Sequence, residues 1–235
     1  VAVMWKHFLS LIFPDPNMCV CCETPLATLG LCEKCRNYFD EVARLEGQCG
    51  RCGVYGVRAP VCDTCREWPA YYKGNTALLP YTGKAREAIV RFKFHNEPWR
   101  VRGFADVIKR HAPIEADALV PVPLHPKRLR ERGYNQSLLL ARVIAEVWAL
   151  PVATDWLVRT VNTPHQTGLA KSARKDNVAH AFAVPPKTVE TVKGKDILLV
   201  DDVITTGSTL LACARTLHQA GAGEIYSLTL AAGIR

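Results

Sequence analysis

The sequence of 235 residues has no apolar run long enough to cross a bilayer, which takes about 20 residues as a helix. The apolar stretch at residues 1–13 is shorter, carries Lys6 and His7, and lacks a small-residue cleavage site. Its large side chains recur at roughly helical spacing, which predicts a short helix docked on the body of the protein rather than an export signal. We therefore expect a cytoplasmic protein without membrane insertion.

The sequence also lacks the Gly-Lys-Ser/Thr end of a P-loop, which excludes that class of nucleotide site. A basic excess is missing from both ends of the chain, because residues 1–70 hold seven Lys/Arg against eight Asp/Glu and residues 181–235 hold five of each. Residues 71–180 hold eighteen against nine and so account for the net charge of +8. This central excess suits a polyphosphate or nucleic-acid partner, although a solvated basic face has the same composition.

Cysteine is nearly absent after residue 65, where only Cys213 remains. Eight of the nine cysteines before that point form four Cys-x2-Cys pairs, and shifting the first two pairs by 30 residues reproduces the last two. Two such pairs supply the four thiolates of a tetrahedral structural zinc site. We therefore predict two structural zinc ions, held by Cys19, Cys22, Cys32, Cys35, Cys49, Cys52, Cys62 and Cys65.

Other interpretations of the cysteines are weaker. A disulfide framework needs an oxidising compartment, which nothing in the sequence indicates, and a redox motif is not expected to occur four times. We favour sequential pairing, with one ion for each repeat, although the spacing also allows interleaved pairing. Cys21 is an extra thiol, and Cys213 is predicted to lie in the core. Apolar residues are sparse around the pairs, so each ribbon is expected to need its metal to fold.

The four consecutive apolar residues 197–200 predict a central parallel strand that is covered on both faces. Asp201 and Asp202 follow at its carboxyl end, where open α/β sheets bind their ligands. The Thr/Gly/Ser run 205–209 then leads into a helical pattern, and Gly207 allows the positive φ of a tight loop. Backbone N–H groups of such a loop, at a helix N-terminus, form an anion site.

This order of strand, acid pair, hydroxyl-rich loop and helix resembles the phosphoribosyl pyrophosphate (PRPP) motif of type I phosphoribosyltransferases. The resemblance implies that the acids hold the ribose 2′ and 3′ hydroxyls, that the loop holds the 5′-phosphate, and that Mg²⁺ accompanies PRPP. An ordinary strand-to-helix turn is the alternative. The predicted PRPP-binding residues are Asp201, Asp202, Val203, Ile204, Thr205, Thr206, Gly207, Ser208 and Thr209.

Another strand is predicted at residues 118–123, where an apolar run breaks into prolines and basic residues follow. The polar stretch 134–137 then opens a clear helix through Trp148. Donors and positive charge beside a strand end are what a pyrophosphate group requires, and in type I phosphoribosyltransferases the loop after the first core strand binds it. We therefore predict a pyrophosphate loop that includes Pro123, Leu124, Lys127, Arg128 and Arg132.

A further strand is predicted at Val152–Val158, followed by a polar stretch of about twenty residues. Loops of this length in compact domains are usually functional or disordered, and the phosphoribosyltransferase fold has its mobile catalytic loop here. Within this stretch His165 is either a proton carrier or simply an exposed side chain. The candidate flexible-loop residues are Arg159, Thr163, Gln166, Arg174 and Asn177.

The end of the cysteine-rich region marks the predicted domain boundary. Residues 1–70 are expected to form the N-terminal helix and a double zinc ribbon, and residues 71–235 a phosphoribosyltransferase-like domain. The second domain is predicted to begin with a strand at Tyr71–Tyr81 and helices at Lys84–Phe94 and Trp99–Arg110. Basic and aromatic side chains on these helices fit a groove for single-stranded DNA or, alternatively, a solvated face over a core.

Four motifs in this order resemble the competence protein F (ComF) family, which includes the GntX-type proteins. They are the paired cysteine knuckles, VPVPLHPKRLRERGYNQS at residues 120–137, the segment Arg159–Phe182, and DDVITTGST at residues 201–209. The resemblance covers nearly the whole chain, and Cys21 is its main departure. It implies an α/β protein with the type I phosphoribosyltransferase fold, a central parallel sheet flanked by helices, preceded by a small cysteine-rich double zinc ribbon.

The resemblance also implies a role in DNA uptake during natural transformation, or in the use of DNA as a nutrient. PRPP and single-stranded DNA would be the ligands, and other DNA-uptake proteins the partners. An active phosphoribosyltransferase in nucleotide salvage is the alternative. Such an enzyme needs a hood that selects the nucleobase, and the hood would come from the ribbons or from residues 71–117. The sequence names no acceptor base.

Overall fold

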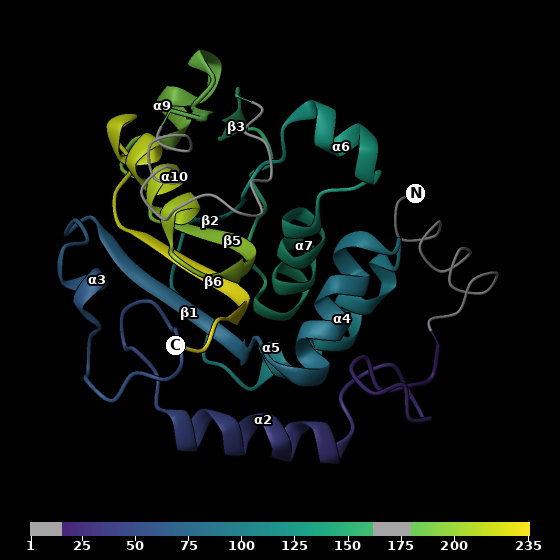
Figure 1. Cartoon of the computed structure of the whole chain (residues 1–235). Coiled ribbons are helices and arrows are strands. Elements are labelled where there is room, and N and C mark those ends of the chain that lie inside the picture. The colour runs from purple at the N-terminus through teal and green to yellow at the C-terminus, as the bar shows by residue number, and fades with distance from the viewer. Residues whose placement is uncertain (1–15, 162–179) are drawn as a thin grey trace.

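The computed structural model describes residues 16–161 and 180–235, so the helix predicted at residues 1–13 lies outside the described residues. The centre of the fold is a four-stranded sheet in which all strand pairs are parallel (Figure 1). Across the sheet the strands are ordered β1 (Tyr72–Pro80), β6 (Ile225–Ala232), β5 (Ile197–Ile204) and β2 (Ala118–Pro121).

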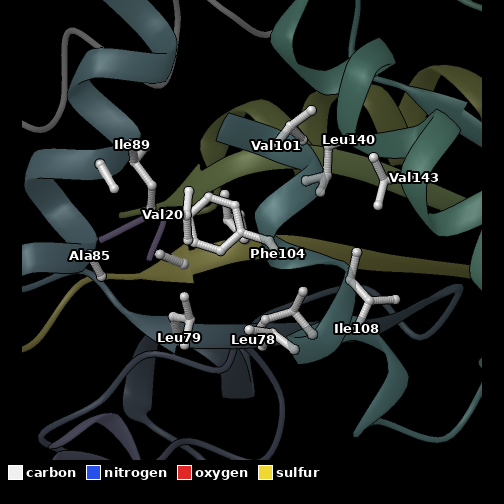
Figure 2. Close-up of a cluster of buried hydrophobic side chains, with 14 of the residues drawn as sticks. Val20, Leu78, Leu79, Ala85, Ile89, Val101, Phe104, Ile108, Leu140 and Val143 are labelled. Atoms are coloured by element: carbon white, nitrogen blue, oxygen red, sulfur yellow. The ribbon is translucent and has the colours of Figure 1, made fainter. Parts of the chain in front are cut away.

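Both faces of the sheet are covered, and the internal strand β5 contributes to both cores. Leu198 and Val200 join one buried cluster, whereas Ile197 and Leu199 join a second cluster, because successive side chains of a strand point to opposite faces. Figure 2 shows part of the first cluster, in which Phe104 lies at the centre of the aliphatic side chains. The prediction of a buried central strand is confirmed.

Helices flank the sheet on each side. Four helical segments contribute to the first cluster: α4 (Gly83–Phe94), η1 (Pro98–Phe104), α5 (Ala105–Lys109) and α7 (Gln136–Trp148). The second cluster is built with α10 (Ser208–Gln219), α9 (Val189–Val192) and the antiparallel pair β3 (Val158–Arg159) and β4 (Phe182–Ala183), with the short turn η2 (Pro186–Thr188) before α9. No helix of the described residues is long and apolar enough to span a membrane.

The helix predicted from Trp99 to Arg110 is helical up to Lys109, but its first part is a 3-10 helix. The structure has the 3-10 segment η1 there, followed by the short helix α5. Gly103 packs so closely on the cysteine-rich segment that a Cβ atom at this position would lie 2.7 Å from Cβ of Val20. Tertiary packing therefore overrides local helix propensity in this segment.

The strand predicted at Val152–Val158 is also wrong. Only Val152 forms a bridge, to Leu119 of β2, and the chain then bends before β3 begins at Val158. Thr154 and Asp155 occupy the bend, and residues of these types favour turns because their side chains bond to nearby backbone. Apolar residues on both sides of the bend produced the misleading pattern.

The two cysteine repeats pack on opposite faces of the sheet. The first repeat, with helix α2 (Glu33–Glu46), joins the cluster shown in Figure 2, and the second repeat, with α3 (Asp63–Arg66), joins the other. The buried guanidinium of Arg100 ties the first repeat to η1 by a 2.6 Å hydrogen bond to the carbonyl of Val20. Because the repeats share both cores with the sheet, the division near residue 70 remains a prediction.

Candidate functional site

The two adjacent acids lie in the carboxyl-terminal half of β5, which continues to Ile204 beyond the predicted strand end. Helices α4 and α7 each contribute one side chain that contacts them. Asp201 Oδ1 accepts hydrogen bonds from Ser137 Oγ and from the N–H of Asp202, both at 2.9 Å. Asp202 is 3% exposed, and its Oδ2 lies 2.6 Å from Nζ of Lys93. The acids are therefore held in place by α7 on one side and by a cation of α4 on the other.

Asp201 lies beside a second acid and a cation. Burial and the charge of Asp202 raise the pKa of Asp201 to about 7, against the opposing effect of Lys93. Burial disfavours the charge on Lys93, but Asp202 and Asp201 outweigh this effect, so the pKa of Lys93 is raised. The site therefore favours the protonated form of Asp201 more than water does, and it favours the charged form of Lys93.

The loop between β5 and α10 has the features of an anion site. Gly207, with φ of 78°, is the N-cap residue of α10. The N–H groups of Thr205, Thr206 and Gly207 make no hydrogen bond within the described residues, while Thr206 Oγ1 accepts the N–H of Ser208 at 3.4 Å. N–H groups that are available before a helix of 12 residues favour a negatively charged ligand.

The motif Asn135-Gln136-Ser137 connects the acids to the basic helix before it. Asn135 Oδ1 caps α7 by accepting the N–H of Ser137 at 2.9 Å, and its Nδ2 donates to the carbonyl of Val122 just after β2. Gln136 Oε1 accepts a 2.5 Å hydrogen bond from Arg132. Three consecutive side chains therefore fix the helix start, a cation and an acid of the site.

Part of the predicted pyrophosphate loop is a helix. Only residues 122–125 are extended after β2, and Lys127, Arg128 and Arg132 lie on α6 (Pro126–Arg132). Pro at the first helical position and Gly133 in the left-handed conformation at its end delimit this helix. Its side chains line an open pocket of about 760 Å³ together with Lys93, Phe94 and Tyr134.

Of the residues predicted for the flexible loop, only Arg159 lies within the described part of the chain. Arg159 lies on β3, where burial and the charge of Arg128 lower its pKa, while Asp201 acts in the opposite direction. The structure therefore brings this arginine into the electrostatic environment of the site. The other candidates, together with His165, lie outside the described residues: Thr163, Gln166, Arg174 and Asn177.

The basic face predicted on α4 is largely occupied within the protein. Arg91 pairs with Glu23 and with Glu97, and Lys93 turns toward Asp202. Of the aromatic side chains considered for stacking, Phe92 and Phe104 are buried in the core, which leaves Phe94 as the exposed aromatic residue of α4, at 57%. Phe94, beside α6, and the partly buried Trp99 are thus the aromatic residues of this group that reach the surface.

The eight paired cysteines form two groups, one for each repeat, in the sequential order. Within each group the sulfur atoms lie within 4.8 Å of one another, and a tetrahedral site with Zn–S bonds of about 2.3 Å requires about 3.8 Å. The N–H of Cys32 donates to Cys19 Sγ at 3.4 Å, and the equivalent N–H of Cys62 donates to Cys49 Sγ at 3.3 Å. The donor sets thus fit two metal ions, and Cys21 belongs to neither group.

Three residues near the site were not predicted from the sequence. In the sequence, Lys93 fits only a general basic pattern, and Ser137 indicates only the start of a helix. Trp68, which follows the last cysteine of the second repeat, lies against Gly207. The polar Asn135-Gln136-Ser137 run, which caps and begins a helix downstream of a strand end, was the one available clue.

Residues 137–235 match the family model described as Phosphoribosyl transferase domain. With its parallel sheet, flanking helices and two clusters of four cysteines, the chain is a protein with the type I phosphoribosyltransferase fold and a cysteine-rich N-terminal region. It belongs to the competence protein F family, since it is 31% identical over 224 residues to Competence protein F of Haemophilus influenzae, covering 91% of this chain and 96% of that protein.

Two other relatives have a similar extent. Competence protein ComFC of Bacillus subtilis is 27% identical over 239 residues, covering 97% of this chain and 89% of that protein. DNA utilization protein YhgH of Escherichia coli K12 is 28% identical over 225 residues, covering 89% of this chain and 94% of that protein. The family and the fold predicted from the four motifs are confirmed.

Proposed function

We propose that this chain binds PRPP with Mg²⁺ at the carboxyl end of β5 and acts with single-stranded DNA in DNA uptake or use, in the cytoplasm. One observation carries the PRPP proposal: two carboxylates on β5 are followed by a loop in which the N–H groups of Thr205, Thr206 and Gly207 make no hydrogen bond within residues 16–161 and 180–235. The carboxylates can accept hydrogen bonds from hydroxyl groups, and the N–H groups can donate hydrogen bonds to an anion. A phosphorylated ribose carries both kinds of group.

Each part of PRPP matches a part of this site. The loop 205–209 and the N-terminus of α10 would hold the 5′-phosphate, and Asp201 and Asp202 would accept the ribose hydroxyls. The cations of α6 and the backbone at Pro123 and Leu124 would hold the pyrophosphate group. Mg²⁺ binds phosphate oxygens while keeping several of its waters, and so would neutralise the pyrophosphate group without an all-protein cage.

Single-stranded DNA would lie along the pocket of α6, beside the PRPP site. The guanidinium of Arg132 lies 5.1 Å from the ring centre of the exposed Phe94, and cations around an exposed ring combine base stacking with phosphate contacts. The names of the relatives, Competence protein F and DNA utilization protein YhgH, support a role with DNA. Other DNA-uptake proteins would be its partners.

Zinc is the metal that we propose for both four-cysteine clusters, with a structural role. Four thiolates and no open position are typical of structural zinc sites. The N–H groups that point at Cys19 Sγ and Cys49 Sγ stabilise thiolates. Each ion would hold its repeat on one face of the sheet.

A second candidate function is phosphoribosyl transfer itself, and the match of residues 137–235 to the phosphoribosyl transferase domain favours it. An assay for pyrophosphate tests this function: transfer would release pyrophosphate only when both PRPP and a free nucleobase are present. Release with any base makes the chain a transferase, whereas tight PRPP binding without release supports a binding role.

Calorimetric titration tests the PRPP proposal. Wild-type protein should bind PRPP in the presence of Mg²⁺, and the double change Asp201→Asn and Asp202→Asn should weaken this binding by about tenfold or more, because charge-assisted hydrogen bonds contribute about 1.5–3 kcal/mol each. Inorganic phosphate, which needs only the loop, should lose much less. The exposed Asp117→Asn is the matched control. Equal loss for both ligands would show that the acids serve folding instead.

A further inference from the structure

The second cysteine repeat contacts the phosphate loop through one side chain. Trp68 follows Cys65, the last cysteine of that repeat, by three residues and is 7% exposed. A Cβ atom at Gly207 would lie 2.8 Å from Cζ2 and 3.3 Å from Cη2 of this indole. The outer edge of the Trp68 ring therefore lies directly against the N-cap residue of α10, whose φ is 78°.

Trp68 is held in turn by the metal-binding knuckles of its own repeat. Its N–H donates to the carbonyl of Cys65 at 3.2 Å. Arg51, between Cys49 and Cys52, donates to the same carbonyl at 2.8 Å and to the carbonyls of Pro69 and Tyr72 at 2.9 and 3.0 Å. Arg51 thus connects the Cys49/Cys52 pair to the backbone on both sides of Trp68. The position of the indole therefore depends on the fold of the whole second repeat.

The chemistry of the indole indicates that this position is kept for packing rather than for polar contacts. Its Nε1 is buried and has no hydrogen-bond partner among residues 16–161 and 180–235. A buried donor without a partner is costly. A smaller apolar ring would avoid this cost but would lack the outer atoms that reach Gly207.

The first repeat contains a related contact on the opposite face of the sheet, made by an aromatic side chain that is 43% exposed. Tyr38 stands at the equivalent position, three residues after Cys35, and its hydroxyl would lie 3.3 Å from a Cβ atom at Gly83. Gly83 also has a positive φ, of 46°, and is the first residue of α4. Each repeat therefore places an aromatic ring against the glycine at which a core helix begins, and only the second repeat does so at the phosphate loop.

We infer that Trp68 is a positioning residue: it transmits the fold of the second cysteine repeat to the loop 205–209 and holds that loop in its anion-binding shape. The inference rests on the proposed function only for the identity of the ligand. The first repeat, through Tyr38, supports α4 and leaves the phosphate loop unaffected. Duplication of the cysteine unit thus gave two supports with different targets.

Hydrogen exchange of the full, metal-loaded chain tests this inference without any ligand. The N–H of Leu211 donates to the carbonyl of Gly207 at 2.9 Å. Trp68→Ala should speed the exchange of this amide and of the next amides of α10 by about tenfold or more, because Gly207 loses its packing partner. Trp68→Phe, which keeps a buried ring but lacks the outer atoms, should give a smaller increase. Tyr38→Ala, the matched control from the other repeat, should leave this segment unchanged. Equal exchange in wild type and Trp68→Phe, or an equal effect of Tyr38→Ala, would overturn the inference.

A double-mutant cycle tests the connection to the repeat. Arg51→Ala should also speed the exchange of the Leu211 amide, and its effect should be mostly lost when Trp68 is already alanine, because the two residues act in one chain of contacts. Additive effects would contradict this. In a second arm, Trp68→Phe should weaken the binding of PRPP and of inorganic phosphate by the same factor. If wild type binds neither, the proposed function fails, while the exchange measurements still decide the role of Trp68.

Discussion

Asp201 should make the folded protein less stable as the pH rises toward neutrality. In the unfolded chain an aspartate has a pKa of about 3.9, whereas burial and the charge of Asp202 raise the pKa of Asp201 in the folded protein to about 7. Between these values the folded state binds the proton more strongly than the unfolded state does. The free energy of unfolding therefore falls as the pH rises through this window. Above about pH 7 the loss of stability is complete and does not grow further.

The size of the effect follows from the same two values. A difference of about three pH units at about 1.4 kcal/mol each sets an upper limit of about 4 kcal/mol. The side chains of Lys93 and Ser137 can relax toward the charged carboxylate and so reduce this cost. We therefore expect a loss of about 1–2 kcal/mol in the free energy of unfolding. Asp201→Asn removes the ionisation and keeps an oxygen for Ser137 Oγ. The variant should thus be more stable than wild type at pH 8, and the difference should shrink toward pH 5.

Urea unfolding of both proteins at pH 5 and pH 8 measures this difference. Asp117→Asn is a control of opposite sign, because the N–H of Asp196 and the ammonium of Lys195 lower the pKa of Asp117. The charged Asp117 carboxylate stabilises the wild type above about pH 4, and this effect is lost as the pH falls below that value. Asp117→Asn should therefore be slightly less stable than wild type at both pH 5 and pH 8. A stability difference between wild type and Asp201→Asn that is the same at pH 5 and pH 8, or that favours wild type at pH 8, would refute the reasoning.

The remaining predictions concern the metal and DNA. Protein purified without chelator should contain about two zinc ions per chain; Cys65→Ser should lose one of them, Cys21→Ser should keep both, and near-zero metal with oxidised cysteines would contradict the zinc assignment. Exchanging Arg128 and Arg130 for Gln should reduce the salt slope of single-stranded DNA binding by about 1.4, because each phosphate contact contributes about 0.7 on single strands. The matched control, Lys187→Gln with Lys193→Gln on the other side of the sheet, should leave the slope unchanged, and an equal reduction would remove α6 from the DNA site.

The sequence was sufficient where a feature is contained in one continuous segment. The strand, the acid pair and the loop from Ile197 to Thr209 are local, and the structure has the predicted strand and the predicted helix after it. The 30-residue repeat of the cysteine pairs likewise separated Cys21 from the two groups of four. Hydrophobic period, ligand spacing and turn chemistry act over short distances, so single-sequence reasoning can use them.

Contacts between distant segments could not be predicted in this way. Ser137 lies 64 residues before the acid to which it donates, and Lys93 on α4 fits a solvated basic pattern as well as it fits a partner for Asp202. The faces chosen by the two repeats, and the contact of Trp68 with Gly207, likewise depend on how the ribbons wrap the sheet. Tertiary packing accompanies the 3-10 start of the helix predicted at Trp99–Arg110, whereas a local bend interrupts the strand predicted at Val152–Val158.

The most direct test of the central claim is a crystal structure of the chain with PRPP and Mg²⁺. Our account predicts the 5′-phosphate within hydrogen-bond distance of the N–H groups of the loop 205–209, and the ribose hydroxyls on Asp201 and Asp202. The pyrophosphate should lie toward α6. PRPP bound only against α6, with the loop empty and the acids still engaged with Lys93 and Ser137 alone, would contradict the account.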